Sequence, residues 1–225
     1  GVGSGNFDVT EAIAEALIAL GPARDLSIAT LNYDGLTLAG LMEMGTNSWG
    51  VPNYRIADLA SGLSATTADI APGVTLEGHW LRTFDDIPPD RAAVLNLHGY
   101  LGWLRDPDTG NVAKFKLEDL RMAGYWDLYA KGGTDWEPVV VLTDRKERAT
   151  LEWPFSMAYV SFQQRLVDAD HWLIAGYGFG DAPVNNLFKS ALRARRRQRL
   201  GDPKVLVIDY GGERVRLRVR RALRE

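Results

Sequence analysis

The sequence predicts an α/β fold built on a doubly wound, mostly parallel sheet with helices on both faces. Five apolar runs of strand length begin near residues 26, 92, 138, 172 and 204, and segments with helical spacing separate several of them. Continuous apolar runs are typical of strands that are buried on both faces of a parallel sheet. Ligands bind outside the carboxyl ends of the strands in such sheets, so the polar residues that follow these runs are the candidates for a functional site.

The length and composition fit one globular domain or a small pair, and we expect a single domain covering residues 1–225. Hydrophobic residues make up 46% of the 225 positions, which is enough for a sizeable core, and the chain contains no cysteine. Disulfides, thiolate zinc sites and a cysteine nucleophile are therefore excluded, and a reducing compartment is permitted. No stretch approaches the roughly 18 apolar residues that span a bilayer, and the first residues lack a signal pattern. We expect a cytoplasmic protein with no membrane partner.

The first elements are expected to be a helix, a strand and a second helix. Apolar residues recur at helical spacing over 10–20, and Thr10 or Asp8 is a suitable N-cap. The apolar run 26–31 predicts a buried strand, and helical spacing resumes over 36–42.

The middle of the chain shows little periodicity. Residues 46–90 and 104–137 are predicted to be irregular or to hold small inserted helical regions, with loops and short strands within 46–90 and one helix over 116–129. The apolar run 92–97 predicts a strand. Pro138–Leu142 is rich in β-branched residues and predicts a further strand of the parallel sheet, buried on both faces.

A strand, a glycine-rich turn and a helix are predicted around position 176. The apolar run Trp172–Ala175 is followed by glycines at 176, 178 and 180, and Pro183 then opens a segment with helical spacing. Such a junction lets backbone approach a ligand closely and aims a helix N-terminus at negative charge. The spacing differs from Gly-x-Gly-x-x-Gly, so a tight turn without a ligand is the alternative. A helix over 156–167 precedes this junction, and a strand over 204–208 follows it.

Positive charge is concentrated at the C-terminal end. From Arg193 onward the chain has 12 basic and 4 acidic residues, against 14 and 25 before it. The arginines of Arg193–Arg199 predict a solvated helix end, with a nucleic-acid or partner contact as the alternative. Arginine alternates with apolar residues over 214–220, which predicts a strand with one apolar and one basic face. We therefore expect residues 211–225 to form a basic tail or to begin a further domain.

The polar residues that follow the predicted strands define the candidate site. They are Asn32, Asp34, His98, Asp144, the segment Gly176–Asp181, and Asp209. A histidine at a strand end can act as a general base near neutral pH, and a hydrogen-bonded structural histidine is the alternative for His98. Turn formation is the alternative for Asn32 and Asp34. No serine in a strained elbow, metal-ligand cluster or Walker lysine accompanies them, so neither a nucleophile triad nor a metal centre is expected.

Four motifs stand in a recognisable order along the chain. Thr30–Asp34 reads Thr-Leu-Asn-Tyr-Asp, Leu97–Gly99 reads Leu-His-Gly, Pro138–Val141 reads Pro-Val-Val-Val, and Gly176–Pro183 reads Gly-Tyr-Gly-Phe-Gly-Asp-Ala-Pro. This set covers about residues 26–210 and resembles the sirtuin family, in particular the sirtuin-like NAD-consuming domains of prokaryotic defence proteins. Sirtuins carry Thr-Gln-Asn-Ile-Asp, His-Gly, Pro-x-Val-Val and Gly-Thr-Ser-Leu-x-Val-x-Pro in the same order.

The resemblance implies a Rossmann-like fold and a set of residue roles. It implies that Asn32 places or polarises a water at the anomeric carbon of NAD, and that His98 acts as a base toward the ribose hydroxyl or that water. It further implies that Asp34 and the Tyr33 backbone hold the nicotinamide carboxamide. The residues that would line the riboses and phosphates are Gly176, Tyr177, Gly178 and Asp209.

Two departures from the family shape the expected activity. Deacylating sirtuins carry four zinc-binding cysteines after the His-Gly, whereas residues 104–137 of this chain contain none. We therefore expect that the chain binds no metal and is not a zinc-dependent protein deacylase. The family's first strand, with its Gly-Ala-Gly loop on the NAD pyrophosphate, has no counterpart before residue 26. We expect this N-terminal unit to be missing or diverged, or partly represented by Gly1–Gly5.

The expected function is hydrolysis of NAD, as substrate, to nicotinamide and ADP-ribose by the effector domain of a prokaryotic antiviral defence system. Control by homo-oligomeric assembly, by a regulatory domain or by a partner protein is expected with it. Two alternatives remain open. One is a non-catalytic module that senses NAD or ADP-ribose, and the other is a structural module that contacts nucleic acid through the arginine-rich tail.

Overall fold

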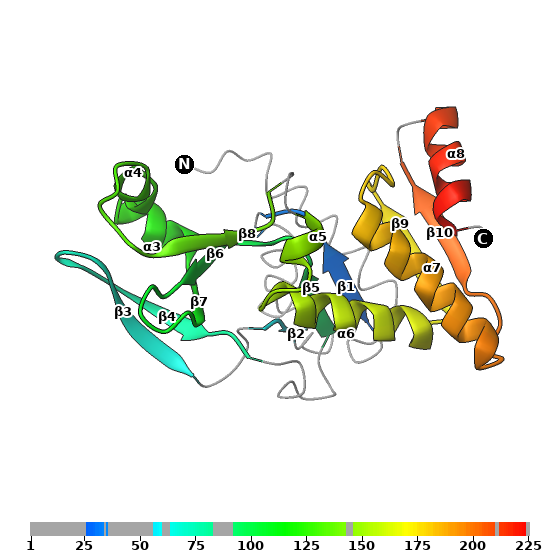
Figure 1. Cartoon of the computed structure of the whole chain (residues 1–225), viewed down its shortest axis with the longest axis horizontal. Helices are drawn as coiled ribbons and strands as arrows, with labels where there is room; N and C mark the ends of the chain where they lie inside the picture. Colours follow the sequence, from blue (N-terminus) through cyan, green and yellow to red (C-terminus); the bar gives the residue numbers. More distant parts are fainter. Residues whose placement is uncertain are drawn as a thin grey trace, which may run out of the picture. The chain divides into compact units, whose positions relative to one another are not determined.

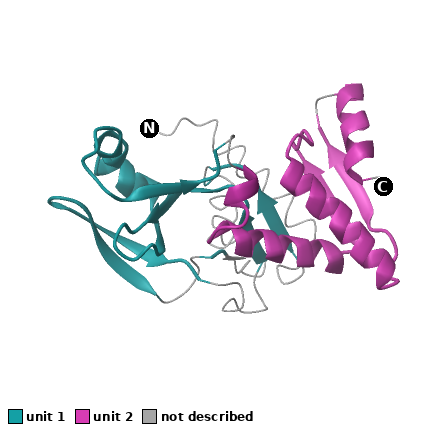
Figure 2. Ribbon diagram, in the orientation of Figure 1, with its two compact units in different colours: residues 1–143 teal, residues 144–225 magenta. Residues whose placement is uncertain are grey.

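The computed structural model describes residues 26–33, 35, 56–59, 64–82, 92–142, 146–209 and 212–223. The chain forms two compact units, unit 1 (residues 1–143) and unit 2 (residues 144–225), which Figure 2 colours separately. Both units contain strands and helices (Figure 1), so the predicted α/β class is confirmed. The helices predicted over 10–20 and 36–42 lie outside the described residues. No described helix is long and apolar enough to cross a bilayer.

Unit 1 contains a three-stranded parallel sheet in the order β1-β5-β2. Its strands are β1 (Ser27–Thr30), β2 (Ile56–Ala57) and β5 (Ala92–Asn96). All five residues of the central strand β5 are buried, as the apolar residues 92–95 predict; the fifth is the polar Asn96. Thr30 pairs with Asn96 at the carboxyl ends of β1 and β5, so the residues that follow these two strands emerge at the same edge of the sheet.

Unit 1 also contains a five-stranded antiparallel sheet in the order β3-β4-β7-β6-β8. Its strands are β3 (Ala65–Ala71), β4 (Val74–Trp80), β6 (Gly99–Arg105), β7 (Val112–Phe115) and β8 (Glu137–Val140). The largest sheet among the described residues is therefore antiparallel, whereas the sequence predicts a mostly parallel sheet. The short strands expected within 46–90 are present as β2, β3 and β4, whereas the prediction of irregular or helical structure over 104–137 misses β7.

The segment predicted as a parallel strand over Pro138–Leu142 is the second correction in unit 1. β8 pairs antiparallel with β6, and Gly99 lies opposite Val140. A β-branched run shows that a strand is favoured but carries no information about the direction of its neighbour. The helix predicted over 116–129 is present as two short helices, α3 (Leu117–Met122) and α4 (Tyr125–Ala130).

A compact apolar cluster holds the antiparallel sheet and these helices together. Its buried members are Ala68, Ile70, Leu104, Ala113, Phe115, Leu120, Tyr125 and Trp136. The Trp136 indole N–H donates to the Asp69 carbonyl at 3.1 Å, and the Tyr125 hydroxyl donates to the Trp136 carbonyl at 2.9 Å. These bonds satisfy buried polar atoms and link segments that are far apart in the sequence. At Gly102 any Cβ would collide with the Phe115 carbonyl, so the neighbouring strands can approach only at a glycine.

Unit 2 consists of a two-stranded parallel sheet and four helices among its described residues. Its elements are α5 (Lys146–Ala149), α6 (Phe155–Asp168), β9 (His171–Ala175), α7 (Ala182–Arg197), β10 (Lys204–Ile208) and α8 (Gly212–Leu223). Helices α6 and α7 pack against each other, and the Phe188 ring lies 5.9 Å from Phe162 and 5.6 Å from Trp172 of β9. The predicted order of helix, strand, glycine turn, helix and strand is confirmed.

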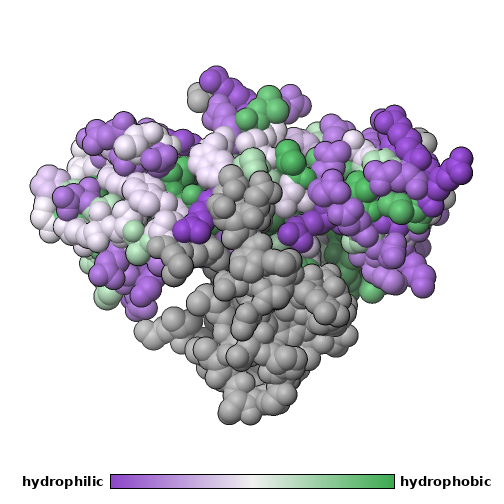
Figure 3. Space-filling model, turned by 90° about the horizontal axis from the view of Figure 1, so that it is seen from below, coloured by the Kyte–Doolittle hydropathy of each residue, from purple (hydrophilic) through white to green (hydrophobic). Residues whose placement is uncertain are grey.

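The last element, α8, corrects the strand predicted over 214–220. Val215, Val219 and Ala222 are spaced i, i+4 and i+7, so residues that alternate with arginine also form one stripe of a helix. Ala222 is buried, the two valines are half-buried, and α8 packs against α7. The five arginines of α8 are exposed, as are Glu213 and Leu217. In Figure 3 the surface at the right of the view shows many hydrophilic (purple) side chains with hydrophobic (green) ones between them.

Arg195 is buried, although the sequence places it in a solvated helix end. Its side chain is 1% exposed. The guanidinium donates to the carbonyls of Val167 at 2.6 Å and Ala169 at 2.9 Å. It also donates to the Gly201 carbonyl at 3.0 Å and to the Asp170 carboxylate at 2.7 Å. Arg195 therefore ties the end of α6 to the segment that follows α7, whereas its neighbours at 193, 196, 197 and 199 are exposed as predicted.

Candidate functional site

The carboxyl ends of β1 and β5 bring three of the predicted site residues together in unit 1. Asn32 and Tyr33 follow β1, and His98 follows β5, its parallel neighbour. The Leu97 N–H donates to the Thr30 carbonyl at 3.0 Å, which extends the pairing one residue beyond β5. The rings of Tyr33 and His98 are stacked, with centroids 6.3 Å apart and planes inclined by 27°.

The Asn32 side chain is exposed at this edge of the sheet. The turn after β1 is held by a local bond, in which the Asn32 backbone N–H donates to the Thr30 hydroxyl oxygen at 3.1 Å. The bond uses the backbone of Asn32 and leaves the side-chain amide accessible. Asn32 can thus belong to a turn and present its amide to a water or a ligand at the same time.

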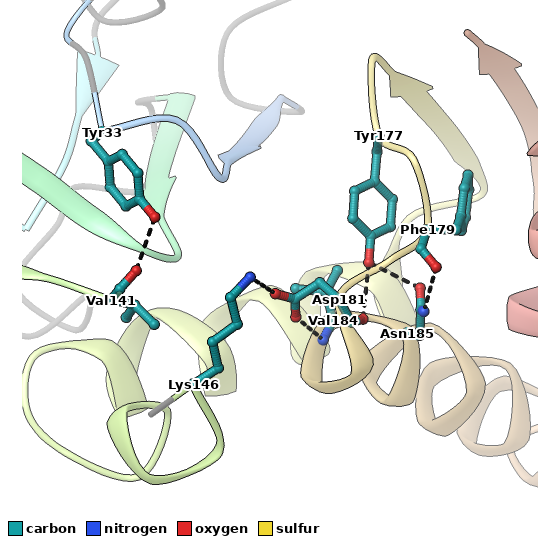
Figure 4. Close-up of polar contacts among 8 residues, drawn as sticks. All are labelled: Tyr33, Val141, Lys146, Tyr177, Phe179, Asp181, Val184 and Asn185. Carbon is teal, nitrogen blue, oxygen red and sulfur yellow. Dashed lines mark hydrogen bonds and ion pairs between the residues drawn. The ribbon is translucent and has the colours of Figure 1, made fainter. Parts of the chain in front are cut away.

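Tyr33 is fixed at both its side chain and its backbone. Its hydroxyl donates to the Val141 carbonyl at 2.9 Å (Figure 4), and its carbonyl accepts a hydrogen bond from the Leu101 N–H at 3.0 Å. A ligand carboxamide would have to share the second lone pair of that carbonyl or use the Tyr33 N–H. The phenol serves as an anchor for the turn.

His98 lies in the interior of unit 1. Its side chain is 4% exposed, its ring faces Tyr33, and its carbonyl accepts a hydrogen bond from the Val141 N–H at 2.9 Å. An imidazole in this place can act on a ligand only if the ligand reaches the buried ring. The two predicted catalytic residues therefore differ in solvent exposure, since the Asn32 side chain is exposed and the His98 side chain is buried.

The glycine loop (Gly176–Gly180) follows β9 in unit 2, and its three glycines are exposed. Gly176 has φ +64°, a left-handed conformation that favours glycine, and its N–H donates to the Ile208 carbonyl at 2.9 Å. Asp209 comes directly after Ile208 and is half-buried. The glycine loop and Asp209 therefore lie at the same end of the β9–β10 pair.

Tyr177 and Asn185 attach the glycine loop to α7. The Tyr177 hydroxyl lies 2.9 Å from the Asn185 Oδ1 and 3.0 Å from the Asp181 carbonyl oxygen, and either can accept its proton (Figure 4). The Asn185 Nδ2 donates to the Phe179 carbonyl at 3.1 Å. Phe179 has φ +53°, which is uncommon for a residue with a side chain, so this bond stabilises a strained backbone.

Asp181 is buried at the start of α7 and is paired with a cation. Its side chain is 5% exposed; one carboxylate oxygen accepts the Val184 N–H at 3.1 Å, and the other lies 2.8 Å from the Lys146 Nζ (Figure 4). The helix N-terminus is thus occupied by the protein's own carboxylate, whereas the sequence predicts that it is open to an anion.

Two tyrosines beside Asp181 remain protonated. Burial raises the pKa of Tyr159 and Tyr177 above the ordinary range, and the negative charge of Asp181 raises the pKa of both further. Tyr159 is 6% exposed, and its hydroxyl has no hydrogen-bond partner among the described residues. Both phenols can donate a hydrogen bond, and neither can act as a base near neutral pH.

The predicted site residues divide between the two units. Unit 1 holds Asn32, Tyr33 and His98, and unit 2 holds Gly176, Tyr177, Gly178 and Asp209. Asp34 and Asp144 lie outside the described residues. Across the part of the chain that the structure describes, no group of three acidic or histidine side chains is arranged to hold a metal ion.

Sequence reasoning missed Lys146, Tyr159 and Asn185. Asn185 is signalled only by its position one helical turn after the capping residue Asp181, and the partnership of Lys146 with Asp181 has no local signal because 35 positions separate them. Comparisons of the chain with protein-family models and with curated protein sequences find no match.

Proposed function

We propose that this chain is an NAD glycohydrolase, which cleaves NAD to nicotinamide and ADP-ribose as the effector domain of a prokaryotic defence system. One observation carries the proposal. Asn32 and Tyr33 follow β1 and His98 follows its parallel neighbour β5, with the Tyr33 and His98 rings 6.3 Å apart. Two of the four motifs that resemble the sirtuin-like domains, at 30–34 and 97–99, thus follow adjacent parallel strands, at the kind of edge where α/β sheets bind ligands.

The proposal includes a sirtuin-like, doubly wound and Rossmann-like arrangement of the parallel strands. It is supported by the parallel pairing in both the β1-β5-β2 sheet and the β10-β9 sheet. In this proposal the segment 99–140, which contains no cysteine and packs around apolar side chains such as Phe115 and Trp136, corresponds to the zinc module of the deacylases. This substitution favours a reaction on NAD alone over protein deacylation.

The proposed chemistry makes modest demands on the protein. Nicotinamide in NAD is a cationic leaving group, so cleavage of its bond to ribose needs no general acid. The site must stabilise an oxocarbenium-like centre and present a water to it. We assign the water to the exposed Asn32 amide, the carboxamide to Asp34 and the Tyr33 backbone, and the proton of the water or the ribose hydroxyl to His98. Gly176, Tyr177, Gly178 and Asp209 are assigned to the riboses and phosphates.

The experiment that tests the proposal follows the loss of NAD by chromatography. The wild-type chain is expected to convert NAD to nicotinamide and ADP-ribose, and a rate that rises more steeply than protein concentration would support control by assembly. Asn32→Ala should lower the turnover at least about 100-fold, the scale expected for a group that orients the attacking water. Its unfolding free energy should change by less than about 0.5 kcal/mol, because the side chain is exposed.

Asn111→Ala is the matched control for this variant. Asn111 is also exposed, and its backbone N–H also donates to a threonine hydroxyl two residues earlier, at 3.2 Å from the Thr109 Oγ1. The control should retain wild-type turnover. No NAD loss in the wild type at any protein concentration, or equal turnover in Asn32→Ala and wild type, would contradict the proposal.

The burial of His98 favours one second candidate, a module that binds NAD or ADP-ribose without cleaving it. A base that is 4% exposed is poorly placed to receive a proton from an open site. Calorimetric binding of NAD with no nicotinamide released would select this candidate over the hydrolase.

A further inference from the structure

Arg218 of α8 is held against the glycine loop. Its Nη1 donates to the Gly178 carbonyl at 3.1 Å, although 40 positions separate the two residues. The side chain is exposed, and a guanidinium has five N–H donors. Among the described residues, no other hydrogen bond from this guanidinium is formed. The Arg218 guanidinium therefore lies at the glycine loop, and its other N–H groups can donate to a ligand.

The backbone of the glycine loop is open beside this cation. A Cβ added at Gly180 would meet nothing within 4 Å, and one added at Gly178 would meet only the Arg218 side chain, at 4.0 Å. Within the described residues the backbone N–H groups of positions 177–180 form no hydrogen bond. Consecutive free N–H groups near left-handed residues, here Gly176 and Phe179, are a feature of loops that bind anions.

Two carboxylates of the described residues lie at the glycine-loop end of unit 2. Asp181 is buried and already paired with Lys146 at 2.8 Å, and Asp209 is half-buried. Arg214 and Arg221 lie four residues before and three residues after Arg218, on the same side of α8, and both are exposed. They extend the positive potential along the helix.

We propose that Arg218 and the exposed glycine loop bind a phosphate of the nucleotide substrate, with Arg218 supplying the charge for its pyrophosphate. The identity of the nucleotide rests on the proposed function, whereas the anion site rests on the contact of Arg218 with Gly178. A planar guanidinium pairs with phosphate oxygens in a bidentate manner, and loop N–H groups add donors at fixed positions. We assign the site to a small phosphate ligand rather than to nucleic acid, because the Arg218 guanidinium is held at the glycine loop by its bond to the Gly178 carbonyl.

Calorimetric titration of the full chain with ADP-ribose, which carries the pyrophosphate and is not cleaved, tests the proposal. Arg218→Ala should weaken binding about 10- to 100-fold, and Arg218→Lys should weaken it less, because the charge is kept and the bidentate geometry is lost. Arg216→Ala is the matched control. It removes the same charge from another side of α8 and should change binding less than about 3-fold. Binding of nicotinamide riboside, which has no phosphate, should be the same in all four proteins.

Each outcome decides for or against the anion site. Equal losses of ADP-ribose affinity in Arg218→Ala and Arg216→Ala would overturn it, and so would no loss in Arg218→Ala. It would also be overturned if both variants lost affinity for a single-stranded oligonucleotide and that loss exceeded the loss for ADP-ribose. If the wild type binds no ADP-ribose, the proposed function fails, and inorganic pyrophosphate then serves as the probe. Pyrophosphate binding that depends on Arg218 and not on Arg216 would retain the anion site, and its absence would remove it.

Discussion

Arg195 shows how much of unit 2 depends on a single side chain. Its guanidinium lies in the interior and supplies donors to carbonyls at the end of α6 and after α7, as well as to one carboxylate. Each buried carbonyl that loses its donor costs about 1–3 kcal/mol. We expect Arg195→Ala to lower the unfolding free energy of unit 2 by about 3–5 kcal/mol, measured by denaturant unfolding of the full chain.

Arg196 provides the comparison for Arg195. It is next in the sequence, its side chain is 44% exposed, and it pairs with Asp202 at 3.0 Å. Exposed ion pairs contribute little, so Arg196→Ala should cost less than about 1 kcal/mol. Similar losses of unfolding free energy in Arg195→Ala and Arg196→Ala would show that the Arg195 side chain is not buried in solution.

The ion pair of Arg195 also predicts a pH dependence. The pKa of Asp170 is held below its ordinary value by the hydrogen bond from Arg195 and by the charge of that cation, with smaller contributions from His171 and Lys204. Because the folded pKa is the lower one, the ionised carboxylate stabilises the fold above about pH 4, the unfolded value. This stabilisation is lost as the pH falls through the folded pKa.

Asp170→Asn should therefore be less stable than wild type near neutral pH, with a difference that narrows as the pH falls below about 4. Urea unfolding at a series of pH values measures the difference. A constant difference at every pH would mean that Asp170 contributes through packing or hydrogen bonding alone and not through its charge.

At the scale of elements, the strands and helices that carry strong local patterns are predicted well. β5, β9, β10, α6 and α7 all occur where apolar runs, glycines and Pro183 place them. In unit 2 the element that is predicted wrongly is α8, because alternation of arginine with valine and leucine satisfies both a period of two and a stripe at i, i+4 and i+7. The helical form lets the stripe of Val215, Val219 and Ala222 become buried or half-buried, and α8 packs against α7.

The helical assignment of α8 leads to a test with paired variants. Val219 is half-buried and Leu217 is 54% exposed, although both would lie on the apolar face of a strand. Val219→Asp should lower the unfolding free energy by about 1–3 kcal/mol, because it places a carboxylate against α7. Leu217→Asp adds the same charge and should change it by less than about 0.5 kcal/mol. Equal costs for the two variants, measured by denaturant unfolding, would favour a strand.

For the whole molecule, binding of the product ADP-ribose should be visible as stabilisation. Ligand at 100 times its dissociation constant contributes about 2.7 kcal/mol. In a chain of this size that corresponds to a rise in melting temperature of roughly 5–10 °C. Hydrogen exchange should then report slower exchange in peptides that cover residues 26–33 of unit 1 and 171–180 of unit 2. If exchange is slower in neither segment, the proposed function is contradicted. If exchange is slower in only one segment, ADP-ribose binds to the unit that contains that segment.

The candidate site could be predicted in outline, because polar residues at strand ends stand out against the apolar runs before them. Asn32, His98 and Gly176 are found in this way. The exposure of each one could not be predicted, and neither could Lys146 or Arg218, since each acts on a residue 35 or more positions away. Pairing across such distances depends on which elements pack together, and local spacing does not record this.

The sequence by itself determined the α/β class, the strands that start near 26, 92, 172 and 204, and the glycine turn after β9, since these follow from local apolar runs and from backbone conformations that glycine allows. The tertiary structure decided the antiparallel sheet, the helical form of α8 and the burial of Arg195. The physical reason is that strand direction, the choice between two periods and the solvation of an arginine are set by partners distant in the sequence. Trp136 for the antiparallel sheet and the carbonyls around Arg195 are such partners.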